Sequence, residues 1–393
     1  MREPGAYSPG APAGAAADTL PAELPAAVTA PETDVALWAI IFAGGIGSRF
    51  WPLTSPEQPK PLLKLVSDHT LIEDSISRLQ PAIPPERVLI LTSRDIAPAI
   101  RSVTKDLPDA NVLVEPQPLG TAAALAWGVQ ELTSRAGPSA MVCAIHCDLA
   151  VDFDEHFRLT LRRAAGIAAS EQALVSVGIR ATRPETGFGY VQPGAPLDSD
   201  TLLAQGGAHT TLAFVEKPSA HEASARIANG AVWHSGIVVG SAGTFMEELR
   251  EHTVELGGAL VSLAAGDMPG FVDRVRATSL ERGLLERSHR LLVILGEFGW
   301  DDVGTWASLR RARELDDDGN GASGPAFFVD SAGNVVHAER GTVVLFGVDN
   351  LLVVTRDGLT FVTSLERSSD LKPLLDALPG SMRVNPKGNG PSK

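Results

Sequence analysis

Three glycines and two cations stand close together near the start of the chain. Gly44, Gly45 and Gly47 follow a short apolar run, and Arg49 and Lys60 come soon after them. A short, uniformly apolar run is typical of a parallel strand that is buried on both faces. Glycines let the backbone turn sharply and bring N–H groups up to an anion, which fixed positive charges also attract. The stretch therefore predicts a phosphate-binding loop at the end of a buried strand.

Two familiar glycine loops do not fit this stretch. A P-loop requires Gly-Lys followed by Ser or Thr, whereas Ser48 and Arg49 follow the last glycine here. The dinucleotide fingerprint requires a third glycine where this chain has Phe50. A plain tight turn between a strand and a helix is the alternative. The prolines at positions 52–61 favour the phosphate site, because they keep the next segment extended and hold Lys60 on a loop facing the turn.

Composition limits the class of protein. With 393 residues, 44% of them hydrophobic, the chain is long enough for one large domain and a small one. A net charge of −14 argues against general nucleic-acid binding, which needs a basic face. Cys143 and Cys147 lack structural-zinc spacing, so we interpret them as reduced, buried thiols. No stretch has the ~20 apolar residues of a membrane span, and no signal peptide is recognised. We therefore expect a cytoplasmic protein with no nucleic-acid or membrane partner.

Strand-like and helix-like segments alternate through the first half of the chain. Alternation of this kind predicts an α/β fold, with a Rossmann-like, mostly parallel sheet flanked by helices. In such sheets, ligands bind beyond the carboxyl ends of the strands. After the first strand, the predicted strands lie at 87–91, 111–114, 141–145 and 173–179, and the predicted helices lie at 67–79, 94–105, 121–134 and 154–170.

Two residues at one strand end are candidates for recognising a nucleobase. Glu115 directly follows the predicted strand at 111–114, and Thr121 begins the next helix. Guanine presents its N1–H and N2–H₂ donors together, so one carboxylate can accept both hydrogen bonds. Thr121 is as well suited to cap the helix as to contact a ligand.

The glycine loop resembles a known signature. The sequence GGIGSRFWPLT, followed by PKPLLKL, is similar to that of the nucleotide-sugar pyrophosphorylases, and its Phe-Trp-Pro-Leu version at 50–53 resembles the bacterial mannose-1-phosphate guanylyltransferases. In that family a sugar 1-phosphate attacks the α-phosphorus of a nucleoside triphosphate and releases pyrophosphate. The resemblance implies that Arg49 and Lys60 are catalytic, stabilising charge on the α-phosphate and the leaving pyrophosphate. It implies nucleotide binding by Ala43, Gly44, Gly45, Gly47, Ser48, Glu115 and Thr121.

Later motifs resemble the sugar-binding segments of the same family. The turn around Gly189 is similar to its GYGY segment, and Glu216-Lys217-Pro218 matches its EKP in full. By themselves, Glu216 and Lys217 would be a surface ion pair of ~0–1 kcal/mol. His234 replaces the Asn of the family's Trp-Asn-Ser-Gly. The resemblance implies that Gly189, Glu216, Lys217 and His234 bind the sugar phosphate.

Two aspartates at strand ends match the metal ligands of that family. Asp148 lies in His-Cys-Asp-Leu where the family has Pro-Ala-Asp-His, and Asp302 lies in a motif resembling its W-S-D-V-G-S-W. Mg²⁺ is commonly held by one or two carboxylates together with substrate phosphates. The resemblance therefore implies a Mg²⁺ clamp made of Asp148 and Asp302. Glu281 and Glu286 stand where a family helix carries acids, and we interpret them as structural.

The C-terminal quarter of the chain changes pattern. Short alternating apolar runs at 326–329, 343–346 and 351–355, with a helix near 368–378, predict a small β domain. It resembles the short, β-helical C-terminal domain of the same enzymes, which often makes a dimer contact, so we expect a homodimer. The predicted organisation is a disordered extension at 1–34, a nucleotidyltransferase domain of the GT-A-like type at 35–318, a β-rich domain at 319–380 and a disordered tail at 381–393.

Together these motifs predict transfer of GMP from GTP to mannose 1-phosphate with Mg²⁺, giving GDP-mannose and pyrophosphate. One alternative is the same chemistry with another sugar 1-phosphate or nucleotide, because His234 and the pair Leu119-Gly120 depart from the family pattern. A second alternative is a non-catalytic regulatory subunit of the same fold. Retention of all the charged motif residues disfavours that alternative.

Overall fold

The computed structural model describes residues 36–55, 57–197, 207–311 and 315–384. The extension predicted to be disordered at 1–34 lies outside the described residues. Contacts divide the chain into two compact units. We call residues 36–45 and 60–302 the sheet unit, and residues 46–59 and 303–384 the β unit. This division groups residues 46–59 and 303–318 with the C-terminal strands, whereas the sequence predicted that they belong to the nucleotidyltransferase domain.

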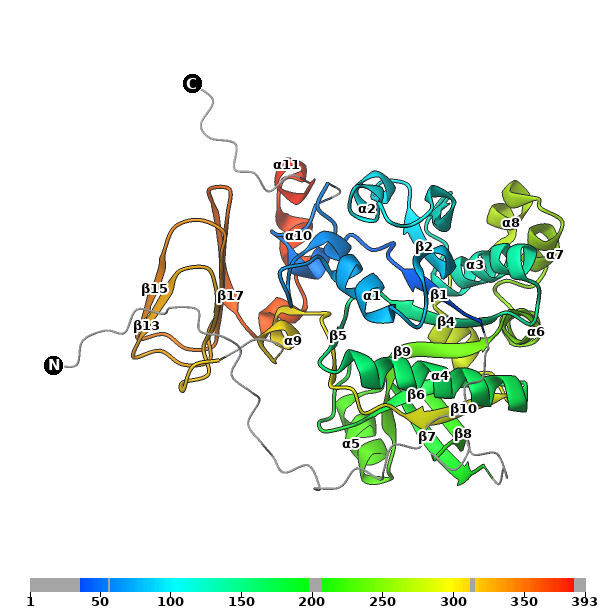
Figure 1. Ribbon diagram of the computed structural model, residues 1–393. Coiled ribbons are helices and arrows are strands. Elements are labelled where there is room, and N and C mark those ends of the chain that lie inside the picture. The colour runs from blue at the N-terminus through cyan, green and yellow to red at the C-terminus, as the bar shows by residue number, and fades with distance from the viewer. Residues whose placement is uncertain (1–35, 56, 198–206, 312–314, 385–393) are drawn as a thin grey trace. The chain divides into compact units, whose positions relative to one another are not determined.

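A nine-stranded sheet organises the described part of the sheet unit, in the order β3-β2-β1-β4-β9-β6-β10-β8-β7 (Figure 1). Strands β3, β2, β1 and β4 are parallel, and antiparallel pairs enter at β9, β8 and β7. The strands are β1 (Leu37–Phe42), β2 (Val88–Ser93), β3 (Val112–Glu115), β4 (Met141–His146), β6 (Leu174–Arg180), β7 (Gly189–Pro196), β8 (His209–Glu216), β9 (Val232–Ser241) and β10 (Leu291–Leu295).

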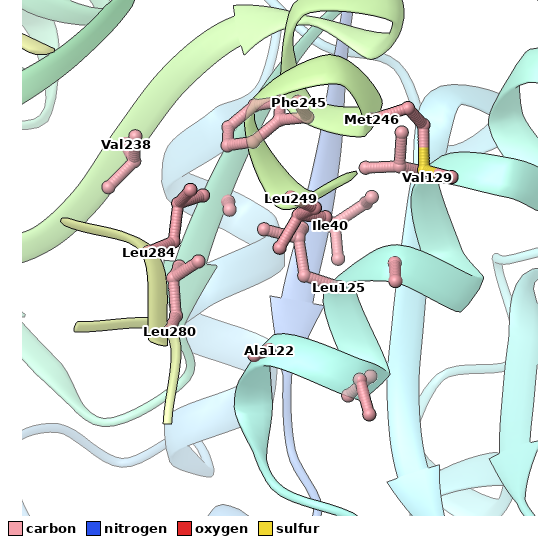
Figure 2. Close-up of a cluster of buried hydrophobic side chains, with 14 of the residues drawn as sticks. Ile40, Ala122, Leu125, Val129, Val238, Phe245, Met246, Leu249, Leu280 and Leu284 are labelled. Atoms are coloured by element: carbon pink, nitrogen blue, oxygen red, sulfur yellow. The ribbon is translucent and has the colours of Figure 1, made fainter. Parts of the chain in front are cut away.

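Helices cover both faces of this sheet, because side chains of a central strand alternate between two cores. Ile40 of β1 packs with side chains of α3 and α6 (Figure 2), whereas Ile41 packs with side chains of α1 and α4. Each fully buried Leu or Ile contributes about 1.5–3 kcal/mol. The mostly parallel sheet flanked by helices is thus confirmed. The helices are α1 (Leu71–Leu79), α2 (Ala97–Val103), α3 (Thr121–Ala136), α4 (Asp154–Glu171), α5 (Ala220–Ala228), α6 (Ala242–His252), α7 (Ala259–Ala264), α8 (Met268–Arg274) and the π-helical turn Glu281–Leu285.

Helix α1 begins four residues later than the sequence predicted, and its N-terminal cap explains the difference. The Thr70 hydroxyl accepts a hydrogen bond from the backbone of Glu73 at 3.3 Å, and the Glu73 carboxylate accepts one from the backbone of Thr70 at 2.8 Å. This reciprocal capping box satisfies two backbone donors of the first turn. The helix therefore starts after Thr70 rather than at residue 67.

The β unit consists of short parallel strands stacked in coils, followed by helices. One sheet has the order β12-β14-β16-β17, and β13 pairs with β15 in parallel. Asn334 is fully buried and links successive coils, since its side chain accepts from the Leu351 backbone and donates to the Val348 carbonyl. The elements are α9 (Trp306–Arg311), β12 (Gly321–Ser323), β13 (Ala326–Val329), β14 (Val335–Ala338), β15 (Val343–Phe346), β16 (Leu351–Arg356), β17 (Leu359–Ser364), α10 (Lys372–Ala377) and α11 (Gly380–Val384).

Helix α11 occupies the start of the segment that was predicted to be a disordered tail. A contact within the β unit orders this end of the chain, because the indole N–H of Trp51 donates to the Met382 carbonyl at 3.2 Å. The Trp51 ring also meets the edge of Phe361 at 5.3 Å between centroids. The prediction of disorder is therefore wrong for residues 381–384, and residues 385–393 lie outside the described part.

A short two-stranded ladder completes the sheet unit. Strand β5 (Leu149–Val151) follows β4 directly, and β11 (Trp300–Asp302) pairs with it in antiparallel fashion. Among the described helices, none is long and apolar enough to cross a membrane.

Candidate active site

The two predicted metal ligands lie at one end of the β5–β11 ladder. Asp148 occupies the turn between β4 and β5, and Asp302 at the end of β11 pairs with Leu149, the residue after Asp148. Residues far apart in the sequence are thus brought together by backbone pairing. Two carboxylates at one strand end supply hard oxygen donors, which are the ligands that Mg²⁺ accepts together with phosphate oxygens. The donor set therefore fits Mg²⁺.

Lys60 is buried, and its ammonium contacts the Asp148 carboxylate directly. Burial alone would raise the pKa of the Asp148 carboxyl, but Lys60 and the nearby His146 outweigh burial and lower that pKa to about 2. Asp148 is therefore ionised throughout the physiological range. Lys60 thus contacts a carboxylate that is predicted to bind metal, and its positive charge lies beside that carboxylate.

A second charged pair flanks this group. The Nε2 atom of His146 lies 3.9 Å from Oε1 of Glu281, in the π-helical turn. Burial would lower the pKa of His146, but Glu281, Asp148 and Asp302 raise it. Burial would raise the pKa of Glu281, but His146 lowers it to about 2. The pair therefore favours the protonated form of His146, close to Asp148 and Asp302.

The predicted sugar-binding residues of β7 and β8 lie side by side. Gly189 pairs with Glu216, and a Cβ atom on Gly189 would lie 2.9 Å from the Glu216 carboxylate and from the Phe214 ring, so a larger residue would have to displace these side chains. The Glu216 carboxylate is 2.7 Å from the Lys217 ammonium. The backbone N–H of Glu216 donates to Glu286 at 2.8 Å, which fixes the turn. Burial raises the pKa of Glu216, and the charge of Glu281 adds to that rise.

His234 also lies in this region, but its ring is buried. Its Nδ1 atom is 2.9 Å from the Ser176 hydroxyl, and its ring meets Phe214 at 5.2 Å between centroids. Burial lowers the pKa of His234 to about 4, so the imidazole is neutral. Glu281 and His146 both act electrostatically on it. One of its two ring nitrogens is therefore already engaged within the protein.

Glu115 presents a different environment at the end of β3. Its carboxylate is half-buried, and among the described residues it forms no hydrogen bond or ion pair. Burial raises the pKa of this carboxyl to about 7. Glu115 borders a small pocket with apolar walls, formed by Pro116, Gln117, Leu119, Ala123, Ala124, Trp127, Met268 and Phe271.

Thr121 does not cap its helix. The N-cap position of α3 is Gly120, and the Thr121 hydroxyl accepts a hydrogen bond from the backbone of Leu280 at 2.8 Å. A Cβ atom on Gly120 would lie 2.2 Å from the Thr278 carbonyl, so only glycine fits there. Of the two roles open to Thr121, that of helix cap is wrong, because its hydroxyl instead anchors the segment before the π-helical turn.

The glycine turn is divided between the two units. Ala43 in the sheet unit is buried, and its backbone N–H donates to the Leu91 carbonyl at 2.8 Å. Gly44 and Gly45 follow it and are exposed.

In the β unit, Gly47 has a φ of 82°, a left-handed conformation that favours glycine, and its carbonyl accepts from the Thr54 hydroxyl at 3.0 Å. Ser48 and Arg49 open a 3₁₀ turn that ends at Phe50, and Arg49 is exposed. The exposed side chain of Arg49 is compatible with anion binding.

Another group of possible metal ligands lies elsewhere in the sheet unit. One ligand atom from each of Glu248, Glu251 and His252 falls within 4.8 Å of the others. Glu248, however, accepts a hydrogen bond from Ser288 at 2.6 Å and lies 3.6 Å from Arg290. The positive charge of Arg290 already balances this carboxylate, so we interpret the group as an ion-pair network.

Comparison with known proteins identifies the family. The Nucleotidyl transferase family matches residues 38–319, most of the chain. The chain belongs to this family. A curated mannose-1-phosphate guanylyltransferase of Sinorhizobium fredii is 28% identical over 350 residues, spanning 86% of this chain and 67% of the relative. The alginate biosynthesis protein AlgA of Pseudomonas putida is 29% identical over 351 residues, spanning 86% and 71%. A solved structure named as a mannose-1-phosphate geranyltransferase of Thermus thermophilus has a TM-score of 0.79 at 32% identity, covering 87% of this chain and 99% of that one.

The predicted family, its fold and its enzymatic class are thus confirmed for this nucleotidyl transferase. The structure also adds charged partners that the sequence did not assign to the site. Glu281 and Glu286 were interpreted as structural, yet Glu281 pairs with His146 and Glu286 accepts from Glu216. The resemblance of this segment to a family helix was the available signal for Glu281 and Glu286. It could not indicate their partners, because His146 and Glu216 lie on strands that are distant in the sequence.

Proposed function

We propose that this nucleotidyl transferase transfers GMP from GTP to mannose 1-phosphate, forming GDP-mannose and pyrophosphate. The observation that carries the proposal is the grouping of Asp148 and Asp302 at one end of the β5–β11 ladder, with Lys60 in contact with Asp148. Curated relatives named mannose-1-phosphate guanylyltransferase support the choice of substrates.

The chemistry requires positioning and charge neutralisation more than proton transfer. A sugar 1-phosphate is already an anion, so a general base contributes little. Lys217, whose side chain is 55% exposed, would hold that phosphate, while Glu216 would accept hydrogen bonds from sugar hydroxyls. Arg49 and Lys60 would stabilise the charge that grows on the α-phosphate and on pyrophosphate.

Asp148 and Asp302 would hold Mg²⁺. When bound, this ion neutralises phosphate charge and orients the phosphate oxygens. The contribution of the chain is to keep both carboxylates at one end of the ladder. Lys60 balances the negative charge of Asp148.

Glu115 would select the base. Its carboxylate is unpaired among the described residues and can accept hydrogen bonds from two adjacent donors of a base. Gly44, Gly45, Gly47 and Ser48 would approach the triphosphate through their backbone. The Ala43 N–H is already engaged by the Leu91 carbonyl, so Ala43 would serve only to lead the chain into the turn.

A second candidate is the same reaction with a different sugar 1-phosphate. The observation in its favour is His234, whose Nδ1 atom faces Ser176 where the family has an amide side chain. Only the remaining ring nitrogen is left to meet a sugar, so the pattern of hydroxyls that is recognised would change.

We also propose a cytoplasmic homodimer. Size-exclusion chromatography with light scattering would test the oligomeric state.

The deciding experiment measures pyrophosphate release with Mg²⁺ over a grid of nucleoside triphosphates and sugar 1-phosphates. We expect the maximum for GTP with mannose 1-phosphate. A maximum for another pair would keep the reaction class and change the substrate. If no pair gives pyrophosphate although the protein binds GTP, the chain is a regulatory subunit.

A further inference from the structure

Arg183 forms an unusual contact in the turn that precedes β7. Its guanidinium lies over the ring of Trp233, 4.7 Å from the centroid, and 5.9 Å from the centroid of Phe188. Its Nε and Nη2 atoms are buried and have no hydrogen-bond partner among the described residues. A cation over an aromatic ring gains about 0.5–2 kcal/mol. A buried donor without an acceptor costs about 1–3 kcal/mol.

Two carboxylates stand just beyond hydrogen-bond range of these donors. Nε of Arg183 is 3.5 Å from Glu185, and Nη2 is 4.0 Å from Asp301. Hydrogen bonds of this kind form below about 3.2 Å. A displacement of less than about one ångström would therefore engage both donors. Contacts of this length in an unliganded site often tighten when the substrate binds.

The two ends of this contact belong to different parts of the proposed site. Asp301 precedes Asp302 in β11, the strand that carries a proposed Mg²⁺ ligand. Arg183 and Glu185 lie in the turn that leads to Gly189, opposite Glu216. Arg183 therefore spans the distance from the metal-bearing strand to the sugar-binding strands.

Aromatic rings make this connection stiff. The Trp300 ring, also on β11, meets Phe188 at 5.2 Å and Trp233 at 6.3 Å between centroids. Its indole N–H donates to the Ser235 carbonyl at 3.1 Å. A shift of the turn would therefore move β11 with it, since closely packed interiors transmit displacement.

We propose that Arg183 is a positioning residue that couples the binding of sugar 1-phosphate to the binding of Mg²⁺. The proposal rests on the function proposed above. A sugar phosphate that orders the turn brings Arg183 onto Asp301 and fixes the adjacent Asp302. By linkage, Mg²⁺ must strengthen sugar-phosphate binding by the same factor.

The test measures this coupling factor in the full chain by calorimetry. The dissociation constant of Mg²⁺ is determined with and without saturating mannose 1-phosphate, or whichever sugar 1-phosphate supports turnover. The variants are Arg183→Met, Arg183→Lys and Asp301→Asn. Arg180→Met is the matched control, because Arg180 is exposed at the end of β6.

We expect Arg183→Met and Asp301→Asn each to lower the coupling factor about tenfold. Combining them should cause little further loss, because they remove the same contact. Arg183→Lys should retain part of the coupling, and Arg180→Met all of it. A purely structural Arg183 would lower thermal stability and leave the coupling factor within twofold of wild type. That result, or the absence of coupling in the wild type, overturns the proposal.

Two further outcomes are kept separate. If Arg183→Met does not fold, as judged by tryptophan fluorescence, Asp301→Asn decides the question alone. If the wild type turns over no substrate pair in the grid, the proposed function has failed, and the coupling proposal fails with it. A wild type that turns over substrate but shows unchanged coupling in the variants contradicts only the proposal for Arg183.

Discussion

The two ends of the proposed site in the sheet unit differ in whether their charged side chains are paired. At the metal and sugar end, Lys60 contacts Asp148, His146 faces Glu281, and Lys217 pairs with a carboxylate. At the base end, Glu115 is a half-buried carboxylate with no partner among the described residues. The charges at the metal and sugar end are therefore balanced within the protein, whereas the Glu115 carboxylate has no counter-charge among the described residues.

This difference follows from what each end would bind. Phosphates and Mg²⁺ bring strong charges, so the groups that receive them are held in place by counter-charges. A nucleobase is neutral, and only its donors can offset the cost of burying the Glu115 carboxylate. The metal and sugar end should therefore depend on ion pairs, and the base end on pH.

Removing Lys60 should give the largest effect. Lys60→Ala leaves Asp148 without its counter-charge and removes a charge that would stabilise pyrophosphate. Turnover should fall by about 100–1,000-fold, as for loss of one preorganised donor. Lys64→Ala is the control, because Lys64 is exposed. Pyrophosphate release by Lys60→Ala within a few-fold of the wild-type rate would refute the proposed role.

Asp302→Asn should weaken metal binding without disturbing the ladder. The amide keeps the shape of the side chain but loses the negative charge that Mg²⁺ prefers. Loss of a group that only supports a metal ligand already costs roughly 10–100-fold in metal affinity. The Mg²⁺ concentration that gives half-maximal activity should therefore rise by at least that factor. The exposed Asp106, changed to Asn, is the control. An unchanged Mg²⁺ requirement would remove Asp302 from the clamp.

The fold of the sheet unit was predictable because its signals are local. Uniform apolar runs mark buried strands such as β2 and β4, and alternation with helices predicts a parallel sheet. The antiparallel pairing of the later strands was not predicted from the sequence. The pairing of β9 with β4, β6 and β7 is set by tertiary contacts rather than by the residue pattern of β9. The start of α1 was missed because the capping box at Thr70 overrides the polar residues before it.

The candidate site was predictable only where a residue's position in a local motif is enough to indicate its role. Asp148 and Asp302 stand at strand ends, so their meeting follows from the topology. Glu281 could not be assigned, because its partner His146 lies on a distant strand. Thr121 was ambiguous, since its hydroxyl serves the backbone of Leu280 rather than its own helix.

The pH dependence of GTP binding tests the base end. The pKa of Glu115 is raised to about 7, so its ionised fraction rises from about one tenth at pH 6 to about nine tenths at pH 8. GTP affinity should therefore increase about tenfold over this range beyond any titration of the ligand. Glu115→Gln, measured in parallel without metal, should lose that increase. If both proteins show the same pH profile, Glu115 does not contact the base.

The same pKa has a consequence for stability. A carboxyl whose pKa is higher in the folded state than its usual 4.5 favours the protonated folded protein. The free energy of unfolding should therefore fall as pH rises from about 4.5 to 7, and Glu115→Gln should remove this contribution. Asp148, with its pKa near 2, contributes no change in that range.

The smallest effect is expected from Glu286, which touches the sugar end only through the backbone. Glu286→Ala removes the acceptor of the Glu216 N–H, a hydrogen bond worth about 0.5–1.5 kcal/mol, so the KM for sugar 1-phosphate should rise a few-fold. Glu286→Gln keeps a carbonyl acceptor and should behave like the wild type. GTP affinity should not change in either variant, because the hydrogen bond between Glu216 and Glu286 does not involve Glu115. An equal loss of GTP affinity would mean that the two ends are not independent, and the contrast between them would have to be abandoned.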